Sequence, residues 1–181
     1  MTLAASPRAS RRLLWAVVAG SLVTMISLGV RATFGLFLDP ISNALDSPRA
    51  VFALAVAIQN LVWGLGQPVA GALADRFGSG RVLVIGAAIY AGGMSMMAGS
   101  TTPLGLYVSG GFIVGLGLAA ASFSVVLAAV GRIAPPERRS LALGVVTAMG
   151  SVGHFLLVPI TQAWISDLGW QTSLFVLAVI A

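Results

Sequence analysis

Long apolar segments separated by short polar connections run along the whole chain. Six of them are predicted to be helices that cross a membrane: residues 13–38, 51–74, 82–98, 104–130, 141–165 and, incompletely, 172–181. The connections carry the glycine, proline and charged residues that end helices, as in "DRFGSGR" and "GRIAPPERRS". Because about 20 apolar residues are needed to cross a hydrocarbon core of ~30 Å, this pattern predicts an all-α, multi-spanning membrane protein.

The sixth segment is shorter than a membrane is thick. Its ten residues from Thr172 to Ala181 would rise about 15 Å, which is half of the hydrocarbon core. A helix that stopped there would leave its last carbonyl groups without partners in lipid, which is costly. We therefore expect the sequence to be the front of a longer protein, with its last helix truncated.

Basic residues gather at every second connection. They lie in the N-terminal residues, between the second and third segments and between the fourth and fifth: Arg8, Arg11, Arg12, Arg76, Arg81, Arg132, Arg138 and Arg139. The other connections contain only Arg49. Because positive residues mark the cytoplasmic side, we expect residues 1–12 to be a cytoplasmic tail. The expected location of the protein is a plasma membrane, such as a bacterial inner membrane. Topology thus explains the net charge of +5, and we expect no nucleic-acid partner.

The composition excludes several kinds of chemistry. Hydrophobic residues make up 58% of the chain and charged residues 8%, whereas a soluble domain has about 25% charged residues. Cysteine and lysine are absent and His154 is the only histidine, which excludes thiolate, P-loop, Schiff-base and His-rich metal sites. We therefore expect a protein that is not an enzyme, with no cofactor and no catalytic or metal-binding residues.

The second and fifth segments end with similar patterns. Pro68 and Pro159 each precede a glycine by ten residues, Gly78 and Gly169, and an aspartate stands shortly before each glycine. A new apolar segment begins after each one. This repetition predicts two three-helix units of inverted topology, an arrangement common in transporter folds.

Glycines in two segments are expected to permit close contacts between helices. Gly111 and Gly115 form a GxxxG pair, and Gly144, Gly150 and Gly153 lie along the fifth segment. Small residues at such spacings let helix backbones approach one another, so packing is their expected role.

The stretch "GALADRFGSGR" resembles the signature between the second and third helices of the major facilitator superfamily. Five residues match its glycine, acidic and basic positions: Gly71, Asp75, Arg76, Gly78 and Arg81. "PPERRSLALG" is also similar to this family, and "RATFGLFLDPI" and the pair Gly169–Trp170 look like its monocarboxylate-transporter and oxalate/formate-antiporter branch. The resemblance covers essentially the whole chain and implies the six-helix N-terminal bundle of the major facilitator fold.

The resemblance implies that these five signature residues form a conformational latch. In the family, an aspartate at the position of Asp75 pairs with arginines and with a helix N-terminus of the other half, which closes the cytoplasmic side. A carboxylate suits both partners. Gly78 is expected to make a tight turn, Gly71 to permit close helix contact, and Arg138 and Arg139 are further candidates or orientation signals. A helix end that merely carries solvated charge is the alternative.

Arg31 places a permanent charge inside the first apolar segment, eight residues before Asp39. A charge at the centre of a span costs at least about 2.5–3.5 kcal/mol, so it usually faces a cavity and has a function. In the monocarboxylate branch a basic residue at this place binds the substrate carboxylate, which implies the same contact for Arg31, whose guanidinium suits a carboxylate. No acidic residue lies in the predicted spans. The alternative is an arginine that snorkels outward to the membrane surface.

Three more polar residues of the spans are candidates for substrate contact: Gln59, Asn60 and His154. Gln59 and Asn60 are adjacent, so at most one of them faces a cavity directly, and hydrogen bonds between helices are the alternative. Histidine titrates near physiological pH, so His154 is a candidate proton carrier or, alternatively, a neutral donor to a neighbouring helix.

Together these features predict a secondary transporter that moves a small organic anion, such as a monocarboxylate or dicarboxylate, by alternating access. Its expected partners are that anion, a coupling ion or counter-substrate, the lipid bilayer and a C-terminal half that this sequence lacks. Two alternatives stay open. One is an efflux carrier for a neutral or cationic compound, and the other is a six-helix membrane subunit that assembles without transporting.

Overall fold

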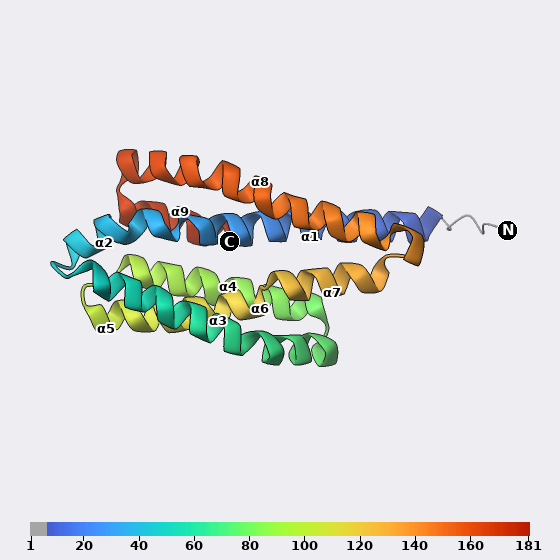
Figure 1. Ribbon diagram of the computed structural model, residues 1–181, viewed down its shortest axis with the longest axis horizontal. Helices are drawn as coiled ribbons and strands as arrows, with labels where there is room; N and C mark the ends of the chain where they lie inside the picture. The colour runs from blue at the N-terminus through green and yellow to red at the C-terminus, as the bar shows by residue number, and fades with distance from the viewer. Residues whose placement is uncertain (1–6) are drawn as a thin grey trace.

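The computed structural model describes residues 7–181, which form an all-helical bundle (Figure 1). The elements follow one another along the chain: α1 (Pro7–Thr33), a 3₁₀ turn η1 (Phe34–Phe37), α2 (Leu38–Ala44), α3 (Arg49–Phe77), α4 (Ser79–Ala98), α5 (Pro103–Leu106), a π-helical stretch η2 (Tyr107–Ile113), α6 (Val114–Ala120), α7 (Phe123–Ile133), α8 (Pro136–Leu168) and α9 (Trp170–Ile180). Five stretches of the described residues are long and apolar enough to cross a membrane: α1 to α2, α3, α4, α5 to α7, and α8. The sixth predicted span, α9, is a shorter apolar helix of 11 residues.

The spans run back and forth between two ends of the bundle (Figure 1). The start of α1, the turn from α3 to α4 and the turn from α7 to α8 lie together at one end. We call it the basic end because it holds most of the arginines: Arg11, Arg12, Arg76, Arg81, Arg132, Arg138 and Arg139. The opposite end holds the turns before α3, α5 and α9.

The helices extend beyond the predicted apolar segments. α1 begins at Pro7, so residues 7–12, expected in a tail, are helical, while residues 1–6 lie outside the described part of the chain. α3 continues to Phe77 and α8 to Leu168, past the predicted ends at residues 74 and 165. Apolarity marks only the part of a helix that lies in lipid, whereas charged residues can prolong the same helix into water.

The fourth span is interrupted, although the sequence predicts an unbroken helix over residues 104–130. Ser122 has extended backbone angles, φ −72° and ψ 148°, and separates α6 from α7. Ser27 of α1 donates to the carbonyl oxygen of Ala121 at 3.4 Å, and the hydroxyl oxygens of Ser122 and Ser124 lie 2.9 Å apart. The hydroxyl group of Ser27 therefore replaces one of the backbone bonds that the break removes, as buried interruptions in membrane helices require.

Two corresponding helix pairs organise the bundle. α1 packs along α8, and α6 packs along α3. An inverted repeat exchanges the first span with the fourth and the second with the fifth, so these two contacts correspond. α3 and α8 each contain their proline, Pro68 and Pro159, and each ends at a glycine with positive φ, 92° at Gly78 and 82° at Gly169. The predicted inverted repeat is confirmed by this correspondence.

Glycines bring α8 against α1. A Cβ at Gly153 would collide with the carbonyl oxygen of Met25, and one at Gly150 would lie 2.7 Å from Cδ1 of Leu28. Gly144 differs, because a Cβ there would meet no heavy atom within 4 Å. Two of the three glycines of the fifth span therefore make the predicted close contact within this chain.

The GxxxG pair brings α6 and η2 against α3 in the same way. A Cβ at Gly111 would lie 3.1 Å from the carbonyl oxygen of Ala55, and one at Gly115 would lie 2.9 Å from that of Gln59. The predicted packing role of this pair is confirmed, and these contacts set the position of α3, which carries most of the polar residues discussed below.

Replacing Gly153 by alanine is expected to lower the free energy of unfolding by about 1–3 kcal/mol, because the added methyl group must push α1 and α8 apart. Gly92→Ala is the matched control, since a Cβ at Gly92 would have open space. That change is expected to be neutral or to stabilise α4 by about 0.5–1 kcal/mol. Unfolding in detergent followed by circular dichroism measures both, and equal stability of the two variants would contradict the packing described here.

Candidate functional site

α3 has a polar face and an apolar face along most of its length. Its polar and glycine positions recur every three or four residues, which places them on one side of the helix: Asn60, Gly64, Gln67, Gly71 and Asp75. Large exposed apolar side chains lie on the other side: Leu65, Val69 and Leu73. Since exposed apolar residues of a membrane helix belong in lipid, the polar stripe faces away from lipid.

The guanidinium of Arg31 reaches from the first span to this polar stripe. Its Nη2 donates to Oδ1 of Asn60 at 2.6 Å, and its Cζ lies 4.4 Å from the centre of the Trp63 ring. The cation–π contact is worth about 0.5–2 kcal/mol, depending on how dry the site is. Within residues 11–181 no carboxylate pairs with Arg31.

Arg31 points toward the middle of the bundle. An ion pair between Asp39 and Arg49, with 2.9 Å between Oδ1 and Nε, aligns the first span and α3 at the end opposite the basic end. Measured from that level, the Cα of Arg31 lies about 12–14 Å deep and that of Trp63 about 21 Å deep. The side chain therefore runs deeper into the bundle, whereas snorkelling would bring it toward the nearer surface.

Arg31 and Asn60 line a pocket of about 390 Å³ between the first span and α3. Its walls combine aromatic, aliphatic and amide side chains: Phe34, Gly35, Leu38, Phe52, Ala53, Val56 and Gln59. Two buried nitrogen atoms have no hydrogen-bond partner in the described structure, Nε of Arg31 and Nε2 of Gln59. Both are donors that lack an acceptor among the described residues.

His154 lies apart from this pocket. Its side chain is exposed on α8, near Ser151, and it makes no hydrogen bond within residues 11–181, so the expected bond to a neighbouring helix is absent there. The structure thus brings together Arg31, Gln59 and Asn60 and leaves His154 outside. In the same part of the chain, no group of three His, Asp or Glu side chains could hold a metal ion.

Trp63 is a site residue that the sequence analysis missed. It follows Asn60 by three residues, so both lie on one face of α3. That spacing was the available signal. It could not be used without knowing that Arg31 faces α3.

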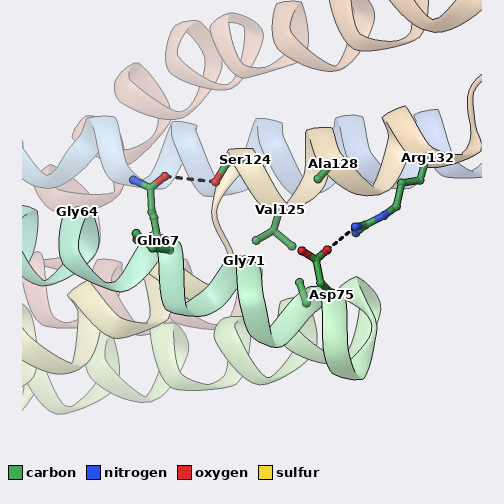
Figure 2. A pocket seen from close by; sticks show the side chains of 10 residues that line it. Gly64, Gln67, Gly71, Asp75, Ser124, Val125, Ala128 and Arg132 are labelled. Atoms are coloured by element: carbon green, nitrogen blue, oxygen red, sulfur yellow. Dashed lines mark hydrogen bonds and ion pairs between the residues drawn. The ribbon is translucent and has the colours of Figure 1, made fainter. Parts of the chain in front are cut away.

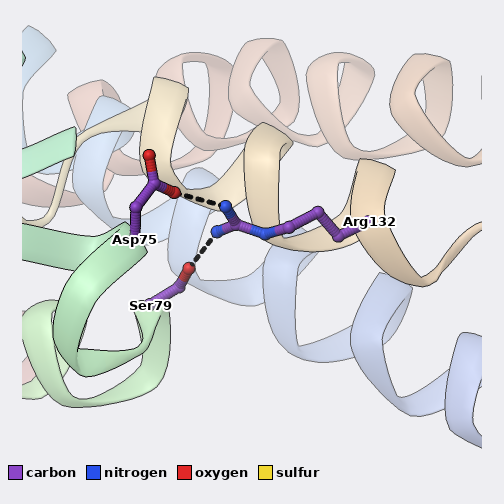
Figure 3. Close-up of polar contacts among 3 residues, drawn as sticks. All are labelled: Asp75, Ser79 and Arg132. Atoms are coloured by element: carbon purple, nitrogen blue, oxygen red, sulfur yellow. Dashed lines mark hydrogen bonds and ion pairs between the residues drawn. The ribbon is translucent and has the colours of Figure 1, made fainter. Parts of the chain in front are cut away.

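At the basic end, Asp75 of α3 pairs with Arg132 of α7 (Figures 2 and 3). Nη1 of Arg132 donates to Oδ1 of Asp75 at 2.5 Å, and its Nη2 donates to Oγ of Ser79 at 2.6 Å. One guanidinium therefore ties the turn between α3 and α4 to the end of α7. From the sequence, Arg132 was predicted only to be an orientation signal. Arg138 and Arg139, the further latch candidates, form no ion pair in residues 11–181.

The ion pair bounds a second pocket, of about 490 Å³, between α3 and α7 (Figure 2). Deeper in this pocket Ser124 donates to Oε1 of Gln67 at 3.2 Å. Gly71 also lines it, and a Cβ there would meet no heavy atom within 4 Å. The expectation that Gly71 permits close helix contact is therefore wrong within this chain, because Gly71 lies on the polar stripe and not on the side of α3 that packs against α6.

The other signature residues do not join the ion pair. Cζ of Arg76 lies 5.3 Å from the ring of Phe77, and Arg81 is exposed in the first turn of α4. Gly78 has the positive φ that the tight turn was expected to need. Within the described residues Asp75 is therefore paired with Arg132 alone, and Ser79 contacts Arg132 and not Asp75.

Several known proteins are similar in sequence to this chain. Residues 20–181 match the sequence profile of the Major Facilitator Superfamily. Monocarboxylate transporter 13 of Bos taurus is 28% identical over 168 residues and monocarboxylate transporter 2 of Rattus norvegicus is 28% identical over 167, each across 92% of this chain. An uncharacterized MFS-type transporter of Escherichia coli (strain K12), YhjX, is 31% identical over 111 residues, or 61% of this chain.

The match covers only part of each relative. It spans 39% of the bovine protein, 34% of the rat protein and 28% of the Escherichia coli protein. In this chain the family profile covers nearly every described residue, and the helical bundle with its inverted repeat agrees with it. The chain therefore belongs to the Major Facilitator Superfamily, where it is similar to the monocarboxylate-transporter branch.

Proposed function

We propose that the chain is the N-terminal half of a secondary transporter that moves a small organic anion by alternating access. One observation carries this proposal: the guanidinium of Arg31 has no carboxylate partner within residues 11–181 and lines a pocket with unused donors. The printed names of several relatives refer to monocarboxylates, which agrees with an anionic cargo.

The charge of Arg31 needs a counter-ion. Holding an arginine at the middle of a span costs at least about 2.5–3.5 kcal/mol, and Asn60 and Trp63 supply only neutral partners. A carboxylate could accept hydrogen bonds from the guanidinium and from Gln59, while its carbon chain contacts Phe34 and Phe52. The same positive charge opposes a cationic cargo.

The basic end would face the cytoplasm, because arginines accumulate on that side of membrane proteins. The pair of Asp75 and Arg132 lies there and joins α3, α4 and α7. In this proposal the ion pair holds the cytoplasmic parts of these helices in one arrangement. Gly71, which lines the adjoining pocket, and Gly78, at the turn after α3, belong to the same latch. A second six-helix unit and a coupling ion or counter-substrate would complete the transport cycle in a cell membrane.

Arg31→Gln in the complete protein is expected to reduce kcat/KM for carboxylate uptake by about tenfold or more. A hydrogen bond to a charged group is worth about 1.5–3 kcal/mol, and 1.4 kcal/mol corresponds to tenfold. Arg31→Lys keeps the charge but loses the planar guanidinium that can bind both oxygens of a carboxylate, so the uptake rate of this variant should be intermediate. Uptake of a radiolabelled monocarboxylate into proteoliposomes measures these effects.

Arg49→Gln is the matched control for that experiment. It removes an arginine whose ion pair with Asp39 is exposed at the end of the bundle opposite the basic end. Uptake should stay within about twofold of the unmodified rate, because exposed ion pairs contribute little to stability. Carboxylate uptake at the unmodified rate in Arg31→Gln would rule out the proposed role of Arg31.

Asp75→Asn and Arg132→Gln are expected to be coupled. Each substitution should lower the free energy of unfolding. The double variant should lose about 0.2–1 kcal/mol less than the sum of the two single losses, as for other exposed ion pairs. Asp75→Asn combined with Arg139→Gln is the control and should be additive. Detergent unfolding provides the free energies, and additivity of the first pair would mean that the ion pair does not join the helices.

A second six-helix unit is expected to be encoded with this one or to assemble with it. The aligned region spans 39% or less of the bovine, rat and Escherichia coli relatives, which leaves room for such a unit in each of them. Sequencing the coding DNA past the codon of Ala181 provides the first check. A stop codon there, together with carboxylate uptake by the purified chain alone, would overturn the proposal of a second unit.

A further inference from the structure

An apolar groove of about 570 Å³ lies on the face of α3 opposite the polar stripe, where α3, α4 and α6 meet. Its floor consists of small residues, Gly66, Ala70 and Ala119, and its sides consist of larger ones, such as Val69 and Ile85. Gly66 of α3 packs closely on Ala119 of α6, since a Cβ at Gly66 would lie 2.7 Å from the Cβ of Ala119. The small side chains on α3 and α6 therefore leave a furrow between larger neighbours, of a volume typical for ligand pockets.

The groove carries one charge, and it lies at the basic end. Arg81 is the only charged residue that lines it, and its exposed side chain has no ion pair or hydrogen bond within residues 11–181. Arg76 lies nearby, over the ring of Phe77, which forms part of the groove wall. The first turn of α4, which contains Arg81, has no side-chain cap, so its backbone N–H groups add positive potential.

The length of the groove matches one leaflet of a bilayer. It follows α4 from Arg81 to Ile89, a rise of about 12 Å, and half of a hydrocarbon core is about 15 Å. The charge thus lies at the depth of the headgroups, and the apolar part extends toward the bilayer centre. Since the polar stripe of α3 lies on the opposite side of the helix, the groove faces lipid and not the second half of the transporter.

We propose that this groove binds a phospholipid with an anionic headgroup from the leaflet at the basic end. Its phosphate group contacts Arg81, and one acyl chain lies along the small residues between α3 and α4. A zwitterionic lipid fills the same furrow but leaves the positive charge less well compensated. The site is separate from the pocket at Arg31, so it persists whether or not the transport proposal holds.

Native mass spectrometry of the complete protein tests this inference. Phosphatidylglycerol and phosphatidylcholine with identical acyl chains are titrated against the protein in detergent. Arg81→Gln should weaken phosphatidylglycerol binding about fivefold, which corresponds to the ~1 kcal/mol typical of one basic residue near a membrane surface. The affinity for phosphatidylcholine should stay unchanged. Arg139→Gln is the control, because it removes the same charge from the basic end outside the groove, and binding should change less than twofold.

Leu73→Trp tests the acyl-chain part of the site separately. Leu73 lines the groove and is 43% exposed, so a larger side chain there fills the furrow without entering the core. This variant should weaken binding of both lipids although every charge is retained. The proposal is overturned if Arg81→Gln and Arg139→Gln have equal effects, or if Leu73→Trp binds phosphatidylglycerol like the unmodified protein. It is also overturned if inorganic phosphate displaces the lipid at equal concentration.

Discussion

A bilayer offers no water to satisfy backbone N–H and C=O groups, and the architecture of this chain depends on that constraint. Its turns at Gly78 and Gly169 lie at the ends of the bundle, where backbone groups can reach water. The break between α6 and α7 is the exception inside a span. It is tolerated because it is buried and because the hydroxyl group of Ser27 reaches the carbonyl oxygen of Ala121.

The same constraint makes charged side chains inside the bundle rare, so their partners are informative. Arg31 is held by an amide and an indole and retains free donors, an arrangement that leaves room for an anion. Asp75 and Arg132 instead compensate each other at the basic end, where both side chains remain at least half exposed. In our proposal the first arrangement binds a ligand, whereas the second is a contact that can be made and broken.

α3 separates two environments. Its polar stripe faces the pockets at Arg31 and at Asp75, and its opposite side forms a wall of the apolar groove that ends at Arg81. Close packing on η2 and α6, through Gly111 and Gly115, fixes how α3 is turned about its axis. A change in that packing would therefore move residues of the proposed anion pocket and of the proposed lipid site together.

The sequence by itself determined the order and alternation of the apolar helices, the basic end, the repeated turns and the place of Arg31 inside the first span. These features follow from local properties, namely how long a run remains apolar and where a glycine or an arginine interrupts it. Only the tertiary structure decided that Arg31 points inward to Trp63, that Arg132 is the partner of Asp75, that Gly71 borders a pocket and that His154 lies apart. Each of these depends on how a helix is turned against its neighbours, and that rotation is set by the packing of residues distant in sequence, such as Gly153 on Met25. The break at Ser122 was missed for the same reason, because its stabilising hydroxyl group comes from another span.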